Sequence, residues 1–341
     1  MKRNMYLLIS LMTALMILIS ACTPAPAPET AVPATAAPGE PVAAAPAFEA
    51  APTTSKTIVF IPKSTDVTYW LALKKGVEDQ TAKLGLESDY QGVAKEADIA
   101  QQVDLVKNIV SSKPYGIVMA ATDAKALAPA VADAIKAGVP VVTVDSGVDP
   151  DESLAYFATD NVAGGASGAE WLCKAVGGKG KVGDLGILPG AQSGIEREKG
   201  FADWMKANCP GVTVVPVQYT GCDATKALNA ATDILTANPD LVGFFGACAA
   251  NGLGAAQAAK AAGKDKEIQI VSFDPNPEII PLFKAGSIGA LIAQDPYTMG
   301  VMGVDAIVAA VNGQPIPEKK ILIPVVVITA ENAKDYPQFL E

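Results

Sequence analysis

The stretches VPVVTVDS at 139–146 and IQIVSFDP at 268–275 decide the predicted fold. Each is a short run of β-branched and apolar residues that leads into an aspartate, Asp145 in the first and Asp274 in the second. Runs without polar alternation are typical of strands buried on both faces of a parallel sheet. Because open parallel sheets bind ligands beyond the carboxyl ends of their strands, both aspartates are candidate binding residues.

Similar runs extend this pattern along the chain. They are TIVFI at 57–61, GIVMA at 116–120, KVGDLGIL at 181–188, VTVVPVQY at 212–219 and LVGFFG at 241–246. Between them, apolar residues recur three or four positions apart, as at Leu127, Val131 and Ile135, which is typical of amphipathic helices. Two series of strands and helices predict an α/β protein with two doubly wound parallel-sheet lobes.

The N-terminus has the features of an export signal. Lys2 and Arg3 precede an apolar stretch at 6–19, and small residues lead to Cys22. The apolar stretch is too short to span a bilayer comfortably, so residues 1–21 are predicted to be a signal peptide. Ile-Ser-Ala-Cys resembles the bacterial lipobox, which implies that Cys22 carries a lipid. The alternative is ordinary secretory cleavage that leaves Cys22 as a free or paired thiol.

The segment that follows cannot build a core. Residues 23–55 contain twelve alanines and eight prolines among thirty-three positions. We therefore predict that 22–55 form an extended linker, which at about 3.1 Å per residue spans up to roughly 100 Å. About 285 residues remain from Lys56 onward, which is more than one typical core and agrees with two lobes.

Charge and composition exclude several functions. The formal net charge is −10, and removal of Lys2 and Arg3 makes it −12, which argues against nucleic acid as a partner. The sequence contains no histidine, the commonest general base and transition-metal ligand. We expect no catalytic residue, no metal and no cofactor.

Several blocks, in order, resemble the ribose- and allose-binding family of periplasmic proteins, the type I solute-binding proteins of ABC importers. They are FIPKSTDVTYW at 60–70, ATDAKAL at 121–127, VPVVTVDS at 139–146, TDN at 159–161, IEREKGF at 195–201, DATKAL at 223–228, VSFDPNPE at 271–278 and IAQDP at 292–296. The resemblance implies two lobes joined by a three-segment hinge with crossings near Asp160, Gln294 and Lys320. The N-terminal lobe would comprise 56–160 plus 295–320, and the C-terminal lobe 161–294 plus 321–341.

The resemblance also implies a binding site. The ligand-binding residues carried over are Lys63, Tyr69, Trp70, Asp145, Arg197, Asp274 and Gln294, and the pocket-lining residues are Asp66, Ser146, Cys222 and Cys248. Carboxylate, guanidinium and amide groups bridge neighbouring hydroxyls, while aromatic rings stack on the C–H face of a pyranose. A sugar or polyol is the implied ligand.

The sequence departs from the ribose-binding pattern at several of these positions. Val67 and Ala120 stand where ribose binders carry asparagine, and Ser146 stands where they carry arginine. Cys222 and Cys248 replace an aromatic residue and the asparagine of an Asn-Asp pair. The pattern therefore disfavours ribose. Lys63 favours a hexose or polyol, and a furanosyl signal stays open because FIPK also opens binders of that kind.

Four cysteines besides Cys22 allow three pairings. The resemblance puts Cys222 and Cys248 at the mouth of the cleft, which implies that they pair. Cys173 and Cys209 are then left to form the second disulfide. Metal binding by these cysteines is disfavoured because the sequence has neither histidine nor CxxC spacing.

The expected function is that of a lipid-anchored, extracytoplasmic substrate-binding protein that binds a monosaccharide or polyol and delivers it to the permease subunits of an ABC importer. We expect a monomer. One alternative is a receptor for a furanosyl quorum-sensing or chemotactic signal. Another is a glycosidase that uses Asp145 and Asp274 as its paired carboxylates. A repressor of transcription is disfavoured because an export signal occupies the place of a DNA-binding helix pair.

Overall fold

The computed structural model describes residues 48–316 and 318–340 of the 341-residue chain. The predicted signal peptide at 1–21, the predicted lipidation site at Cys22 and most of the predicted linker lie outside these residues. The described residues belong to one compact unit. Within it, two sheets define two lobes, as the alternation of strands and helices predicted.

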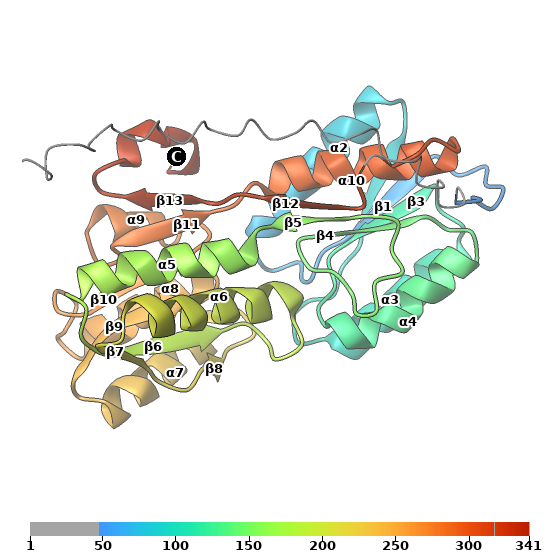
Figure 1. Cartoon of the computed structure of the whole chain (residues 1–341). Helices are drawn as coiled ribbons and strands as arrows, with labels where there is room; N and C mark the ends of the chain where they lie inside the picture. Colours follow the sequence, from blue (N-terminus) through green and yellow to red (C-terminus); the bar gives the residue numbers. More distant parts are fainter. Residues whose placement is uncertain (1–47, 317, 341) are drawn as a thin grey trace, which may run out of the picture. The chain divides into compact units, whose positions relative to one another are not determined.

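The sheet of the N-terminal lobe has, among the described residues, six parallel strands in the order β12-β5-β4-β3-β1-β2 (Figure 1). They are β1 (Thr57–Ile61), β2 (Glu87–Tyr90), β3 (Gly116–Met119), β4 (Val141–Val144), β5 (Tyr156–Thr159) and β12 (Lys320–Ile323). Helices α2 (Tyr69–Lys83) and α10 (Pro296–Val311) pack on one face, and α3 (Ile99–Ser111) and α4 (Ala124–Lys136) on the other. Both faces are thus covered, which explains why the central strands read as continuous apolar runs.

The C-terminal lobe repeats this plan. Its main strand order in the described part of the chain is β13-β11-β10-β9-β6-β7, with β8 also paired to β6 and β13 antiparallel to β11. The strands are β6 (Gly180–Gly186), β7 (Val212–Val214), β8 (Gln218–Tyr219), β9 (Leu241–Gly246), β10 (Gln269–Phe273), β11 (Ala290–Ala293) and β13 (Val326–Thr329). Its helices are α5 (Asn161–Ala175), α6 (Gln192–Asn208), α7 (Ala224–Ala237), α8 (Ala249–Ala261) and α9 (Ile280–Lys284). Helices α5 and α6 cover one face and α7, α8 and α9 the other.

The chain passes between the lobes after β5, after β11 and between β12 and β13. The first two crossings agree with those implied near Asp160 and Gln294. The third was placed too early: β12 pairs with β5 through Ile323, so residues 321–323 belong to the N-terminal sheet and the chain crosses at 324–325. The physical reason is that Ile321 and Ile323 pack against the apolar core of the N-terminal lobe.

The end of the predicted linker also needs correction. The Ala51 amide donates to the Gly138 carbonyl at 2.9 Å, and the Thr53 hydroxyl donates to the Lys113 carbonyl at 2.8 Å. These backbone carbonyls attach residues 51–53 to the N-terminal lobe, so the linker ends before Lys56.

Two glycines hold α6, which carries Arg197, close against α5. A Cβ atom on Gly165 of α5 would collide with the Arg197 carbonyl, and one on Gly200 of α6 would collide with the Val162 carbonyl. Because only a hydrogen fits at each contact, the two backbones touch and the position of α6 relative to α5 is fixed.

A buried carboxylate, Asp184, and a half-buried one, Glu198, lie on β6 and α6. Asp184 on β6 and Glu198 on α6 each keep one carboxylate oxygen without a hydrogen-bond partner, while the Tyr219 hydroxyl donates to the other oxygen of Glu198 at 3.1 Å. Burial raises the pKa of Glu198 to about 7. Burial, and then the neighbouring charge of Glu198, raises the pKa of Asp184 well above its usual value.

We predict that Glu198→Gln reduces the loss of stability on going from pH 5 to pH 8. An acid whose pKa is higher in the folded than in the unfolded state binds its proton more tightly when folded, so stability falls as pH rises from about 4.5 through 7. The free energy of unfolding of the variant minus that of the wild type should therefore be about 2–3 kcal/mol higher at pH 8 than at pH 5. Urea denaturation at both pH values measures this. Glu170→Gln, which removes an exposed carboxylate on α5, is the control. If the free energy of unfolding falls equally from pH 5 to pH 8 in Glu198→Gln and in the wild type, the raised pKa of Glu198 is contradicted.

Candidate functional site

A cavity of about 530 Å³ lies between the lobes at the carboxyl ends of the strands. The N-terminal lobe contributes Lys63, the segment 66–70, Lys95, Glu96 and Asp145 to its wall. The C-terminal lobe contributes Ile187, Arg197, the segments 222–225, 248–250 and 274–278, and Gln294. This is where the ends of the two apolar runs predicted a binding site.

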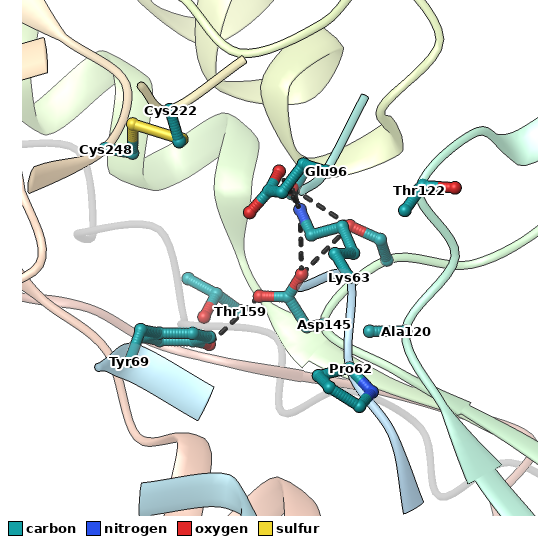
Figure 2. Close-up of polar contacts among 12 residues, drawn as sticks. Pro62, Lys63, Tyr69, Glu96, Ala120, Thr122, Asp145, Thr159, Cys222 and Cys248 are labelled. Atoms are coloured by element: carbon teal, nitrogen blue, oxygen red, sulfur yellow. Dashed lines mark hydrogen bonds and ion pairs between the residues drawn. A yellow bond between two sulfur atoms is a disulfide. The ribbon is translucent and has the colours of Figure 1, made fainter. Parts of the chain in front are cut away.

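The N-terminal side of the cavity carries a buried polar group that we call the Lys63 cluster and define as Lys63, Glu96 and Asp145 (Figure 2). The Lys63 ammonium lies 3.3 Å from Asp145 Oδ1 and 3.7 Å from Glu96 Oε2, and it donates to the hydroxyl of Ser193 in the opposite lobe at 3.1 Å. All four side chains are buried. A buried ammonium is tolerated only with such compensation, so the two carboxylates fix its position.

Asp145 and Asp274 occupy matching positions in the two lobes. Both have a left-handed backbone, with φ of 61° at Asp145 and 66° at Asp274. Their amides still bond the neighbouring strands, Asp145 to the Phe157 carbonyl and Asp274 to the Ile292 carbonyl. Positive φ in a residue other than glycine costs about 1–3 kcal/mol and is concentrated at functional sites. Both aspartates line the cavity.

Arg197 joins three segments of the C-terminal lobe. Its Nε donates to Asn161 Oδ1, its Nη1 to the Ala247 carbonyl and its Nη2 to Gln294 Oε1, each at 2.8 Å. The guanidinium lies 4.0 Å from the centre of the Phe273 ring. Asn161 follows the first crossing and Gln294 begins the second, so one buried cation orders two of the hinge segments.

Gln294 in turn forms hydrogen bonds with one residue of each lobe. Its Oε1 also accepts from the Thr159 hydroxyl at 2.6 Å, and its Nε2 donates to Asp274 Oδ1 at 2.5 Å. Burial raises the pKa of Asp274, opposed by the charge of Arg197 and the hydrogen bond from Gln294. Burial likewise raises the pKa of Glu96, opposed by the charge of Lys63.

The two predicted aromatic residues have different positions. The Tyr69 hydroxyl donates to Asp145 Oδ2 at 2.9 Å, as Figure 2 shows, and the ring of Trp70 meets that of Tyr69 edge-on at 4.9 Å. Trp70 is only 1% exposed and belongs to the apolar core beneath the cavity. Most of its surface therefore packs against protein.

Asp66 and Ser146 complete the predicted pocket residues. Asp66 lines the cavity mouth, where it pairs with Lys95 at 2.5 Å, and Lys95 also lies 3.9 Å from Asp223 of the opposite lobe. Ser146 was wrongly expected on the wall: it is fully buried and is not among the residues that line the cavity. Its hydroxyl lies 2.9 Å from Asp145 Oδ1 and 3.0 Å from the Ser193 hydroxyl, so it supports Asp145 from behind.

Both disulfides join the cysteines that the resemblance paired, Cys222 with Cys248 and Cys173 with Cys209. Cys222 and Cys248 line the cavity, whereas the other pair does not. Figure 2 shows the cavity disulfide apart from the Lys63 cluster, with no polar contact between them.

Sequence reasoning missed Glu96 and Ser193. Glu96 lies in the loop after β2, a strand whose sequence ESDY is exposed and polar and gives no buried-strand signal. Ser193 lies in the first turn of α6, two residues before the IEREKGF block and four before Arg197, and accepts a hydrogen bond from Lys63. The one sequence signal for Ser193 was its place one helical turn before Arg197, which puts the two residues on the same side of α6.

Two further properties concern the described residues as a whole. Within 48–316 and 318–340, no group of three or more carboxylate or cysteine side chains is arranged to hold a metal ion. No helix in this part of the chain combines the length and apolar character required to cross a membrane.

The fold and cavity define a two-lobed binding protein, and comparison with known proteins identifies its family. Residues 58–315 match the family model described as the periplasmic binding protein domain. The D-allose-binding periplasmic protein of Escherichia coli (strain K12) is 32% identical over 263 residues, which cover 74% of this chain and 84% of that protein. The chain belongs to the periplasmic binding proteins, a family of solute-binding proteins, as the sequence resemblance implied.

Solved structures agree with this assignment. An ABC transporter solute-binding protein from Agrobacterium vitis bound to α-D-tagatopyranose has a TM-score of 0.78 at 35% identity, with 82% of this chain and 96% of that chain covered. A second solute-binding protein from the same organism, with bound D-fucose, has a TM-score of 0.78 at 36% identity, with 83% and 98% covered. The predicted periplasmic binding protein type I fold is confirmed.

We predict that Arg197→Lys destabilises the protein by about 2–4 kcal/mol, because one ammonium cannot replace three directed guanidinium bonds and leaves buried acceptors unsatisfied. Chemical denaturation measures the loss. Lys206→Ala, an exposed position on the same helix, is the control and should change stability by less than about 0.5 kcal/mol. Equal stability of Arg197→Lys and wild type would show that the network contributes nothing.

Proposed function

We propose that this chain is the substrate-binding component of a bacterial ABC importer and that it binds a monosaccharide or polyol in the cavity between its lobes. The observation that carries the proposal is the set of planar polar groups that line the cavity. Carboxylates (Asp145, Asp274), a guanidinium (Arg197) and an amide (Gln294) gather there from both lobes. Such groups suit vicinal hydroxyls, because each can exchange two hydrogen bonds with neighbouring oxygens.

The relatives support this ligand class. The proteins compared above are a D-allose-binding protein and two solute-binding proteins bound to α-D-tagatopyranose and D-fucose, all of which are monosaccharides. A cavity of about 530 Å³ lies within the range of small-molecule sites.

Binding without chemistry is the favoured role for the two aspartates. Asp145 is engaged through both oxygens, by Lys63 and Ser146 on one and by Tyr69 on the other. Asp274 is held by Gln294. A glycosidase needs one carboxyl group free to transfer a proton and the other free to attack or to activate water. Groups tied in this way favour a non-enzymatic protein.

Contacts between the lobes support a closing mechanism. The Ala124 amide donates to the Gly190 carbonyl at 3.0 Å, and Lys63 and Ser146 both reach Ser193. A ligand that contacts both walls of the cavity adds to these bonds only when the lobes are together, so it selects the closed state. The closed pair of lobes then presents a surface to the permease that neither lobe has alone.

The N-terminal sequence supports placement outside the cytoplasm. We propose that Cys22 carries the lipid, that the alanine- and proline-rich linker tethers a monomeric binding unit to the membrane, and that the two disulfides are stable there.

Ligand binding is predicted to depend on both aspartates. A thermal-shift screen over pentoses, hexoses, polyols and furanosyl compounds should find a sugar or polyol that raises the melting temperature, because the ligand binds only the folded state. Asp145→Asn and Asp274→Asn should each weaken its affinity by about 10- to 100-fold in calorimetry. Asp133→Asn, exposed on α4, is the control. Wild-type affinity in both cavity variants would refute the site.

Membrane attachment is predicted to depend on Cys22. Expression of the full chain in a bacterial host should place the protein in the membrane fraction, and Cys22→Ser should release it or leave it unprocessed. Labelling with a radioactive fatty acid reads the modification directly. Absence of label on the wild-type chain would disprove the anchor while leaving the proposed binding function intact.

A further inference from the structure

The wall of the cavity is chemically divided. Polar side chains gather in the Lys63 cluster and around Arg197, Gln294 and Asp274. A separate part of the wall, which we call the disulfide wall, consists of Ile187, Cys222, Cys248 and Ala250, and none of these side chains contains oxygen or nitrogen. One region of a bound ligand therefore meets hydrogen-bonding groups and another meets carbon and sulfur.

The disulfide wall is an extension of the hydrophobic core of the C-terminal lobe. Ile187 and Cys248 are members of the buried cluster beneath α5 and α6, and Cys222 and Ala250 pack against that cluster. Ile187 is 2% exposed and Cys248 is 6% exposed. The core thus reaches the cavity surface at this point, and the polar side chains nearest in sequence, Asp223 and Thr225, line the cavity at the edge of the disulfide wall.

The cysteine backbone groups that bond within the lobe do not restore polarity to the wall. The Cys222 amide donates to the Thr220 hydroxyl at 3.2 Å, and the Cys248 carbonyl accepts from the Ser272 hydroxyl at 3.1 Å. The Cys248 carbonyl also accepts from the amides of Asn251 and Gly252. These groups are therefore engaged before any ligand arrives.

The disulfide also limits rearrangement of the wall. It links the residue after the β8 turn to the residue that precedes α8, so two loops from different strands are covalently joined. Neither loop can turn away independently to expose a polar group. A ligand must accept the wall as it is.

We propose that the disulfide wall is an apolar subsite that selects a sugar with a deoxygenated carbon, specifically a 6-deoxyhexose, over the hexose that carries a hydroxyl there. This inference rests on the proposed function and deepens it. The methyl group of the deoxy sugar would lie against the sulfur atoms and Ile187, while its ring hydroxyls meet the charged and amide groups. A hydroxyl at the same position would lose its water without gaining a side-chain partner.

Matched pairs of sugars that differ only in the 6-hydroxyl test the proposal on the wild-type mature protein. The pairs are D-fucose with D-galactose, L-rhamnose with L-mannose, and 6-deoxy-D-allose with D-allose. In each pair that binds, calorimetry should give the deoxy sugar an affinity about 5- to 100-fold higher, the range set by burying one unpaired hydroxyl.

Replacement of the sulfur atoms tests whether the disulfide wall causes the preference. The double substitution Cys222→Ser and Cys248→Ser places two hydroxyls on the wall and should reduce the preference to less than about threefold. The matched control is Cys173→Ser with Cys209→Ser, which removes the other disulfide of the same lobe outside the cavity and should keep the preference. Circular dichroism checks that both variants are folded.

The outcomes separate the two levels of the proposal. If no sugar or polyol binds the wild type, the proposed function fails and the inference fails with it. If parent hexoses bind as tightly as their deoxy partners, the function stands and the inference is wrong, since the 6-hydroxyl then finds a partner such as an amide at the start of α8. A preference that survives in the folded Cys222→Ser, Cys248→Ser variant would also overturn the role of the disulfide. If the Cys222→Ser, Cys248→Ser variant does not fold, the comparison of sugar pairs on the wild type still decides whether the protein prefers deoxy sugars.

Discussion

The guanidinium of Arg197 is the interaction on which the arrangement of the cavity depends. It bonds Asn161 just after the first crossing, Gln294 at the second and the Ala247 carbonyl beside the disulfide loop. Gln294 then forms hydrogen bonds with Asp274 and with Thr159 of the opposite lobe, so it links the guanidinium to both. Because the cation is buried, each of these bonds is needed to offset its lost hydration. The same network therefore fixes the hinge and positions groups for the ligand.

A second buried cation performs the corresponding task at the opposite wall. The Lys63 ammonium forms ion pairs with Asp145 and Glu96 and donates a hydrogen bond to Ser193 of the opposite lobe. The two cations differ in what they join, since Arg197 ties segments of one lobe and the hinge while Lys63 bridges the lobes. In the proposed site, closure and recognition would therefore share residues, because a ligand bound to Asp145 would contact the group that holds Lys63 in place. Under the proposed function, such sharing would couple occupancy of the cavity to the closed state.

In the proposed site, specificity depends on where the cavity wall lacks polar side chains. The apolar core of the C-terminal lobe reaches the cavity at the Cys222–Cys248 disulfide, opposite in character to the charged groups elsewhere on the wall. Hydroxyl-rich ligands differ little in size, so a protein separates them by which hydroxyls it leaves unpaired. At two positions that the resemblance assigns to an aromatic residue and an asparagine, this chain has the cysteines of the disulfide wall.

The sequence by itself determined the α/β class, the two lobes and the placement of Asp145 and Asp274, because buried-strand runs and the residues that end them are local signals. Family resemblance added Arg197, Gln294 and the cysteine pairs. Only the tertiary structure placed Glu96 and Ser193 at the Lys63 ammonium, moved Ser146 behind Asp145 and extended the N-terminal sheet through Ile323. Lys63 and Ser193 are 130 residues apart and on different lobes, so no periodicity links them, and their contact arises only when the hinge brings the two walls of the cavity together.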